Sequence, residues 1–257
     1  MILRMRQICL VAKQLRPVVA DFKAVFDLNI CHVDPYVGRW GLENVLMPVG
    51  NGFLEVVAPV KDGTAAGRYL DRRKGDGGYM VIMQTSAEWL AEARRRVDKM
   101  GIPIVGGRDY GDYQGIQLHP YHTGGAIMSI NWSSGDQDDP RGAWHPAGDQ
   151  WTGMVPSSLV LAMRAAELQA DNPLVLATRW SQILDLPLLR DRHGQPMIHL
   201  DDVELRFVTI SDDRGEGLST IDLSVIDRDE VIERAETRGL RVREDTVTIC
   251  GTRFRLV

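Results

Sequence analysis

Hydrophobic positions in the first 60 residues follow two periods, one typical of strands and one of a helix. Residues 7–12 predict a strand, and strands are also expected over 40–48 and 52–57. Between the first two strands, apolar residues recur every three or four positions, which predicts one buried helix face: Leu15, Val18, Val19, Phe22, Val25 and Phe26. Residues 49–52 predict a tight hairpin, because Asn51-Gly52 supplies positive φ.

The same order of elements returns in a second stretch. A strand is expected over 79–85, followed by a helix that Ser86 caps, and then by strands over 102–105, 115–119 and 126–132. The apolar face of this helix is predicted to consist of Trp89, Leu90, Ala93, Val97 and Met100.

Two further stretches, residues 152–211 and 219–257, repeat the pattern. The third begins with a strand over 158–163, and either Asp171 or Asn172 caps its helix, with Pro173 at the first helical position. Asp227 caps the helix of the fourth. The four stretches therefore predict βαβββ modules in tandem, an α+β fold with two cup-shaped mixed sheets.

Two polar segments interrupt the repeat. Residues 61–78 are charged and rich in glycine, so we expect a connector there. Residues 133–150 form the strongest boundary, and their tryptophans predict that this segment packs against the protein. We expect an N-terminal domain over 1–135 with modules one and two, a linker over 136–151, and a C-terminal domain over 152–257 with modules three and four.

Composition narrows the class of protein. Hydrophobic residues make up 44% and charged residues 25% of the chain, as in ordinary globular proteins, and the net charge of −5 argues against nucleic-acid binding. Cys9 and Cys250 lie in apolar runs and are interpreted as core residues of a reduced protein. A signal peptide and a long apolar run are both absent from the sequence, so we expect a cytoplasmic protein with no membrane partner.

Four segments carry a resemblance to a known superfamily: QICLVA at 7–12, LENVLMP at 42–48, FLEVVAP at 53–59 and LHP at 118–120. With the fourfold module, they resemble the vicinal oxygen chelate superfamily, the glyoxalase, bleomycin-resistance and extradiol dioxygenase fold, over nearly the whole chain. The sequence of these segments is most similar to those of glyoxalase-like proteins. The resemblance implies cups of paired modules, each able to hold a divalent metal ion by residues of its first and last strands.

Carried over to this sequence, the resemblance implies one metal site in the N-terminal half. Gln7 and Glu55 occupy the two ligand positions of module one, while module two offers Met80 (or Tyr79) and Ser129, which are poor ligands. His119 is then the replacement ligand for an ion such as Mn, Fe, Ni, Co or Zn. In the C-terminal half these positions are held by Ser158, Arg206, Thr220 and Arg255. Because arginines repel a cation, no metal is expected there.

Glu55 and two histidines are the candidate catalytic residues. A Glu55 carboxylate that faces the cup could act as a general base, although strand alternation also allows it an outward, solvated position. His119 and His122 lie in one loop, where they could carry protons or simply form a surface turn. The candidate substrate contacts are Glu43, Asn44, Ser129 and His145.

Two functions remain open. The favoured one is a metal-dependent lyase or isomerase of the glyoxalase type, which binds a small oxygen-rich or carbonyl-bearing molecule and uses Glu55 as base. The alternative is a metal-free binding or resistance protein of the same fold; extradiol ring cleavage is less favoured, because the second half lacks a two-histidine, one-carboxylate set. The modules pair either within one chain or across a homodimer.

Overall fold

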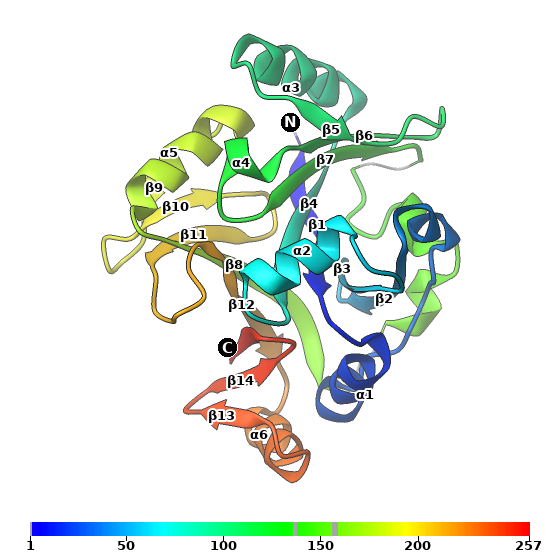
Figure 1. The fold of residues 1–257 in the computed structure, drawn as a ribbon, viewed down its shortest axis with the longest axis vertical. Helices are drawn as coiled ribbons and strands as arrows, with labels where there is room; N and C mark the ends of the chain where they lie inside the picture. Colours follow the sequence, from blue (N-terminus) through cyan, green and yellow to red (C-terminus); the bar gives the residue numbers. More distant parts are fainter. Residues whose placement is uncertain (1, 136–137, 156–158) are drawn as a thin grey trace. The chain divides into compact units, whose positions relative to one another are not determined.

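The strands form two mixed sheets, which confirms the predicted α+β class. The computed structural model describes residues 2–135, 138–155 and 159–257 (Figure 1). In sheet order, the seven-stranded sheet consists of β2 (Leu42–Val49), β3 (Gly52–Pro59), β1 (Leu3–Val11), β4 (Gly77–Thr85), β7 (Ile127–Ser133), β6 (Tyr113–Leu118) and β5 (Ile104–Gly106). The eight-stranded sheet consists of β13 (Arg241–Arg243), β14 (Thr246–Ile249), β15 (Thr252–Leu256), β12 (Gly217–Val225), β8 (Val160–Ala170), β11 (Glu204–Thr209), β10 (Pro196–His199) and β9 (Leu189–Arg190).

Modules two, three and four have the predicted βαβββ order. In each, the first and last strands pair in parallel, as β4 with β7, β8 with β11, and β12 with β15. The other strand pairs of these modules are antiparallel. The predicted strand over 158–163 is part of β8, although Ser158 itself lies outside the described residues.

Module one departs from this order. Between its helix and β2 the chain forms the 3-10 helix η1 (Pro35–Trp40), and the segment before it makes an isolated bridge between His32 and Leu46. The hairpin between β2 and β3 is present, but the positive φ belongs to Gly50, at 60°, and not to Asn51 or Gly52. The turn residues are therefore Gly50-Asn51, with glycine at the first turn position, and the predicted Asn51-Gly52 turn is wrong.

Three of the four module helices begin where capping residues are predicted, and the first helix, for which no cap is predicted, has no side-chain cap among the described residues. The bounds of the four are α1 (Leu15–Phe26), α3 (Ala87–Lys99), α5 (Pro173–Leu184) and α6 (Arg228–Thr237). The side chains of Ser86, Asn172 and Asp227 accept hydrogen bonds from backbone N–H groups in the first turns of the last three. The predicted connector over 61–78 also contains the helix α2 (Ala65–Arg72), which Thr64 caps and which was not predicted from the sequence.

Tertiary contacts divide the chain into two compact units. Unit 1 comprises residues 1–7, 79–145 and 165–218, and unit 2 comprises 8–78, 146–164 and 219–257. In unit 1, Trp180 of α5 meets Phe207 of β11 edge to face, with ring centroids 5.9 Å apart; in unit 2, Phe22 of α1 meets Phe254 of β15 at 5.4 Å. The strands of the seven-stranded sheet come from residues 3–133 and those of the eight-stranded sheet from 160–256. The compact units divide the chain in another way, because unit 1 contains most of modules two and three and unit 2 contains most of modules one and four. The predicted domain division therefore stays a prediction.

Buried positions agree with the interpretation of the cysteines, since Cys9 and Cys250 are both buried. Among the helices in the described ranges, none combines the length and the apolar character needed to cross a lipid bilayer.

Candidate functional site

Glu55 in unit 2 is a buried carboxylate with a fixed hydrogen-bond partner. It lies in the middle of β3, opposite Leu46 of β2, and the residue is only 7% exposed. Asn44, two positions away on β2, donates a hydrogen bond from Nδ2 to Glu55 Oε1 at 2.5 Å. The β2–β3 hairpin thus places the amide diagonally across from the carboxylate, on the same face of the sheet.

Two further residues of unit 2 complete this arrangement, which we call the Glu55 cluster: Glu55, Asn44, Asp34 and Cys9. The backbone N–H of Asp34 donates to Asn44 Oδ1 at 3.0 Å. The Cys9 thiol hydrogen-bonds to Glu55, and burial, the Glu55 charge and this hydrogen bond raise the pKa of the thiol well above its usual value. Cys9 therefore remains a protonated donor and is not a thiolate ligand or nucleophile.

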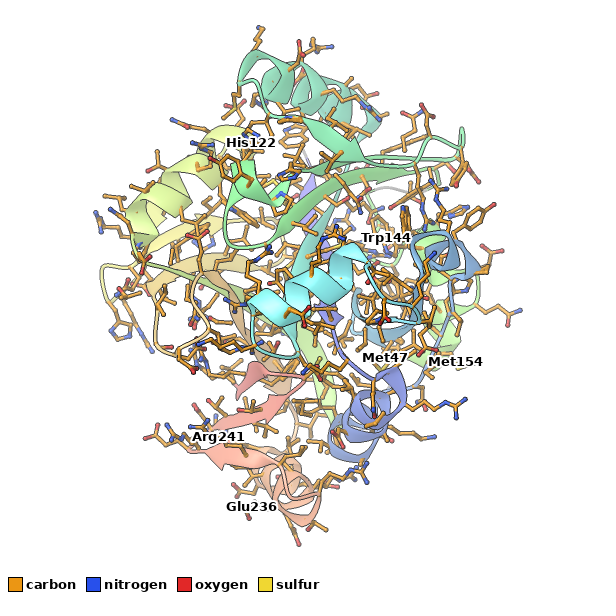
Figure 2. All side chains as sticks on the ribbon, viewed as in Figure 1. Met47, His122, Trp144, Met154, Glu236 and Arg241 are labelled. Atoms are coloured by element: carbon orange, nitrogen blue, oxygen red, sulfur yellow. The ribbon has the colours of Figure 1, made fainter. Side chains whose placement is uncertain are left out.

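Gln7 in unit 1 has a different environment. Its side-chain oxygen accepts a hydrogen bond from the indole N–H of Trp144 at 2.8 Å (Trp144 is labelled in Figure 2), and both residues are buried. The Trp144 ring also meets the Tyr113 ring edge to face, at 5.7 Å between centroids. The segment around Trp144 packs against unit 1 as the sequence predicts, and it occupies the Gln7 oxygen that the metal hypothesis requires.

Three polar, uncharged side chains lie on one face of the β4–β7 pair, next to apolar ones. Ser129 Oγ donates to the carbonyl of Ile116 at 3.1 Å, and Asn131 Nδ2 donates to Ser129 Oγ at 3.0 Å. Gln84, which faces Asn131 in the parallel register, is 1% exposed and donates to the carbonyl of Ala143 at 3.4 Å. Within the described residues, its Oε1 is a buried acceptor without a hydrogen-bond donor. We call Gln84, Ser129 and Asn131 the amide cluster.

His119 and His122 lie together at the surface of unit 1. They belong to the short helix α4 (Pro120–Thr123), which lies between β7 and α5 in Figure 1, and their ring centroids are 6.0 Å apart. His119 is exposed and caps the helix, with Nδ1 accepting from the Tyr121 N–H at 3.1 Å. Pro120 at the first helical position and the capping His119 agree with the surface-turn interpretation, and the role of His119 and His122 as proton carriers stays a prediction.

The two remaining candidates are held by other contacts or lie in solvent. His145 stacks on Tyr113 with ring centroids 5.4 Å apart, and its backbone N–H donates to Ser133 Oγ. Glu43 is exposed on β2. Of the predicted site residues, the structure joins Asn44 with Glu55 and His119 with His122. Gln7 and His145 both lie beside the contacting rings of Trp144 and Tyr113.

Of the three predicted metal ligands, Gln7 and His119 belong to unit 1 and Glu55 belongs to unit 2. In the part of the chain that the structure describes, no group of three or more His, Cys, Asp or Glu side chains could hold a metal. Gln7 Oε1 accepts a hydrogen bond from Trp144, and Glu55 Oε1 accepts one from Asn44. The third residue, His119, is exposed. The ligand set Gln7, Glu55 and His119 therefore stays a prediction from the resemblance, and no chemical step is assigned to a metal.

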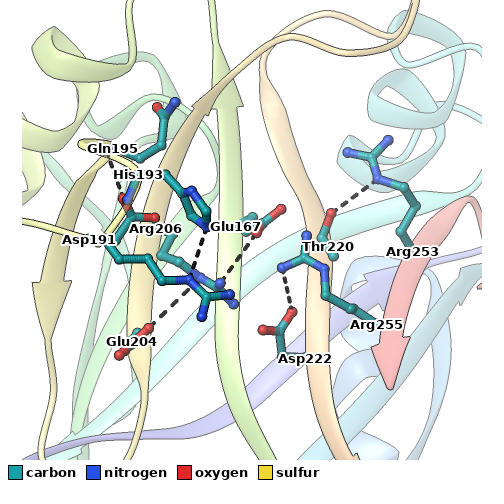
Figure 3. A network of polar contacts seen from close by, with 11 residues as sticks. Glu167, Asp191, His193, Gln195, Glu204, Arg206, Thr220, Asp222, Arg253 and Arg255 are labelled. Atoms are coloured by element: carbon teal, nitrogen blue, oxygen red, sulfur yellow. Dashed lines mark hydrogen bonds and ion pairs between the residues drawn. The ribbon is translucent and has the colours of Figure 1, made fainter. Parts of the chain in front are cut away.

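The structure also shows acidic partners for the arginines of the second half, which the sequence interpretation missed. In unit 1, Arg206 lies opposite Glu167 in the β8–β11 register, with an ion pair of 3.8 Å; in unit 2, Arg255 lies opposite Asp222 in the β12–β15 register, at 3.2 Å (Figure 3). These arginines are neutralised by neighbours and do not simply present positive charge.

Comparison with known proteins establishes the fold. No protein-family model matches the chain, and a search of curated proteins gave no match. A solved structure of a triple mutant of 4-hydroxymandelate synthase from Streptomyces coelicolor is similar, with 12% identity over 92% of this chain and 75% of that chain and a TM-score of 0.69. This chain has the vicinal oxygen chelate fold.

A hypothetical protein from Staphylococcus aureus shares the vicinal oxygen chelate fold over the full length, with 11% identity, 100% of this chain and 99% of that chain covered, and a TM-score of 0.69. Methylmalonyl-CoA epimerase from Mycobacterium tuberculosis matches 50% of this chain and 87% of its own, at 17% identity and a TM-score of 0.43. Identities this low establish the fold and leave the chemistry to the residues described above.

Proposed function

We propose that the protein is an enzyme that removes a proton from the carbon next to a carbonyl group of a small oxygen-rich molecule. The Glu55 carboxylate is the base. The observation that supports this role is a carboxylate that is withdrawn from solvent yet held in one direction by the Asn44 amide at 2.5 Å. Burial disfavours the charged form of a carboxylate and so makes it a stronger base than in water.

In this proposal, the C–H bond breaks, its proton moves to Glu55, and its electron pair moves towards the carbonyl oxygen to give an enolate. If the proton returns to the opposite face of the carbon, the reaction is an isomerisation. If a leaving group departs from the neighbouring carbon, the reaction is that of a lyase. Asn44 donates to Glu55 Oε1 and holds the carboxylate.

The test is solvent exchange in deuterium oxide. Small carbonyl compounds with an acidic C–H group, namely 2-oxo acids, 2-hydroxy ketones and malonyl-type thioesters, are incubated with the protein and followed by proton NMR. We expect exchange at the carbon next to the carbonyl of at least one compound class. Glu55→Gln should reduce the rate at least 100-fold, the size of a general-base contribution.

Glu233→Gln is the control, because Glu233 lies on α6 of the same unit and is exposed. Its exchange rate should equal that of the unmodified protein. Equal rates for the Glu55→Gln variant and the unmodified protein would contradict the proposed base. Elemental analysis of the same samples tests the metal hypothesis: stoichiometric Mn, Fe, Ni, Co or Zn would show that the donors described above have been misjudged.

A second candidate function is a metal-free binding protein for an uncharged molecule that donates hydrogen bonds. The amide cluster favours it, because Gln84 Oε1 is a buried acceptor with no donor in the described residues. Ligand-induced increases in melting temperature, measured over a panel of small amides and alcohols, test this function. Increases that disappear in Gln84→Met and persist in Glu55→Gln would favour binding over catalysis.

Other properties also remain proposals. We propose a small-molecule substrate, no nucleic-acid partner, a cytoplasmic location, and pairing of modules within a chain or across a homodimer. Light scattering of the purified protein distinguishes a monomer from a homodimer.

A further inference from the structure

We infer that module four carries a binding site for an oxyanion, a phosphate or carboxylate group of a small molecule, on one face of its strands. The site is formed by residues 219–257 of unit 2, on β13, β14, β15 and β12. It does not involve the Glu55 cluster, so it goes beyond the proposed function and does not depend on it.

Strand register aligns four polar residues of these strands in one row. Residues that pair directly across neighbouring strands carry their side chains on the same face of a sheet. Arg241 pairs with Thr248 across β13 and β14, and Thr248 pairs with Arg253 across β14 and β15. Arg253 in turn pairs with Thr220 of β12. Two guanidinium groups and two hydroxyl groups therefore alternate along this row, which we call the arginine–threonine row.

The next row on the same face ends in an acid. It consists of Arg243, Thr246, Arg255 and Asp222. Here Arg255 forms an ion pair with Asp222 at 3.2 Å (Figure 3). Arg253 instead donates from Nε to the Thr220 hydroxyl at 3.1 Å, which orients the guanidinium through a neutral partner. The arginine–threonine row thus has two positive charges and no acid among its members, in a chain whose net charge is −5.

Two further acids lie in the turn between β13 and β14. Glu244 and Asp245 connect Arg243 to Thr246, so they extend the second row and not the arginine–threonine row. Asp245 Oδ1 accepts a hydrogen bond from the Thr246 hydroxyl at 3.1 Å. The positive charge of this face is therefore offset mainly at the second row, and the arginine–threonine row is the place where an anion fits.

The opposite face of the same strands is apolar and is covered by a helix. Val247 and Phe254 alternate with the residues of the two rows, and both are buried. The Phe254 ring meets Phe22 of α1 edge to face, with centroids 5.4 Å apart. The polar rows therefore point away from α1. Within the arginine–threonine row, Arg241 is exposed, and Thr248 and Arg253 are half-buried.

The spacing of the row suits one oxyanion held between two guanidinium groups. Arg241 and Arg253 lie on the strands on either side of Thr248, so their backbones are about 10 Å apart, twice the distance between neighbouring strands. Two extended arginine side chains can meet over the gap. The planar fork of a guanidinium matches two oxygens of a carboxylate or phosphate, and the Thr248 hydroxyl can donate a further hydrogen bond.

Arg241 is the arginine of the row that remains available to a ligand. Within the described ranges, its guanidinium has no hydrogen-bond or ion-pair partner, and the residue lies on the edge strand β13 (it is labelled in Figure 2). Arg253 supplies an oriented donor and Arg241 a movable one, so the anion can enter from solvent and be held from both sides.

The experiment follows the arginine side chains of the whole protein by NMR. Protein labelled with ¹⁵N at the arginine Nε atoms is titrated with inorganic phosphate and, separately, with succinate, at constant ionic strength. The signals of Arg241 and Arg253 are identified by their loss in Arg241→Met and Arg253→Met. We expect both signals to shift with one common, saturable dissociation constant. The anion with the lower dissociation constant shows whether phosphate or carboxylate is the group that the site recognises.

Replacing one guanidinium should weaken binding strongly. In Arg241→Met, we expect the dissociation constant, followed on the Arg253 signal, to rise at least about tenfold, because a charge-assisted pair of hydrogen bonds is lost. Thr248→Val, which removes only the hydroxyl, should raise it about fivefold. Arg241 and Thr248 are not fully buried, so these variants test the site even if Arg253→Met does not fold.

Arg228→Met is the control with the same change in charge, because Arg228 is exposed at the start of α6 in the same unit. It should leave the dissociation constant within about twofold, since solvent and salt screen a distant exposed charge. Shifts that rise linearly with anion concentration, or the absence of shifts with both anions, would overturn the site. An equal weakening in Arg228→Met and Arg241→Met would also overturn it, because the anion would then respond only to net charge.

Discussion

Module one and the two C-terminal modules bury their acids with different partners. The described partners of Glu55 are an amide and a thiol, whereas Glu167 and Asp222 each face an arginine across a parallel strand pair. An arginine neutralises a buried acid and makes it part of the structure. The amide of Asn44 is a neutral donor that orients the Glu55 carboxylate. The difference teaches that the same module places acids beside arginines in its third and fourth copies and beside an amide in its first, and the proposed function assigns the base to the acid beside the amide.

Breaking an arginine pair should have the largest effect. Arg206→Met would leave Glu167, whose side chain is 10% exposed, without this counter-charge. We expect a loss of about 2 kcal/mol in the free energy of unfolding, below the roughly 3–5 kcal/mol of a fully buried pair, because Arg206 retains some solvent contact. Urea denaturation measures it.

Arg241→Met, on the edge strand β13, is the exposed control and should change the free energy of unfolding by less than about 0.5 kcal/mol. The double variant Glu167→Gln with Arg206→Met should recover part of the loss. No recovery would show that Arg206 acts through packing and that the comparison of partners is wrong for module three.

The next effect concerns Trp144. Trp144→Phe keeps an aromatic ring against Tyr113 but removes the indole N–H that donates to Gln7 at 2.8 Å. We expect a loss of about 1–2 kcal/mol in urea denaturation, as for other buried hydrogen bonds. Trp40→Phe, at a tryptophan that is 42% exposed, is the control with little change. A loss in the control as large as in Trp144→Phe would argue against a specific role for the Gln7 contact.

Glu55→Gln should affect stability less than either of these changes. Glutamine has nearly the same shape and can still accept from Asn44, and removal of a buried charge offsets any weaker hydrogen bond. We expect the free energy of unfolding to stay within about 1 kcal/mol of that of the unmodified protein. A loss above 2 kcal/mol would place Glu55 with the structural acids of modules three and four.

The smallest expected effect is a pH dependence of the free energy of unfolding that arises from Asp202 in unit 1. Burial of its carboxyl raises the pKa of Asp202 from 3.8 to about 6, although the residue as a whole is exposed and accepts from the Met5 N–H at 3.0 Å. Because the folded pKa is raised, this contribution to stability is present below pH 3.8 and is lost as the pH rises towards 6.

Asp202→Asn keeps the acceptor and removes the titration. Its free energy of unfolding relative to the unmodified protein should therefore improve between pH 4 and pH 7. We expect an improvement below about 1 kcal/mol, because solvent screens an exposed group. Denaturation at both pH values measures the difference, and a difference independent of pH would refute the raised pKa.

Local signals in the sequence predicted the elements well, while contacts that depend on register were missed. The caps Ser86 and Asp227 act within one helical turn, so the sequence shows them directly. The Asn44–Glu55 contact depends on the hairpin register, which the misplaced turn left unknown. Arg206 and Glu167 face each other only after two distant strands pair in parallel, and no local pattern encodes that pairing.

The central claim, that Glu55 is the acid available for chemistry, is tested most directly by the exchange rate of three variants measured side by side. Glu55→Gln, Glu167→Gln and Asp222→Asn remove one buried acid each from modules one, three and four. We predict that exchange into the carbonyl compounds falls at least 100-fold in Glu55→Gln alone. An equal rate in Glu55→Gln, or an equal fall in all three variants, would contradict the account.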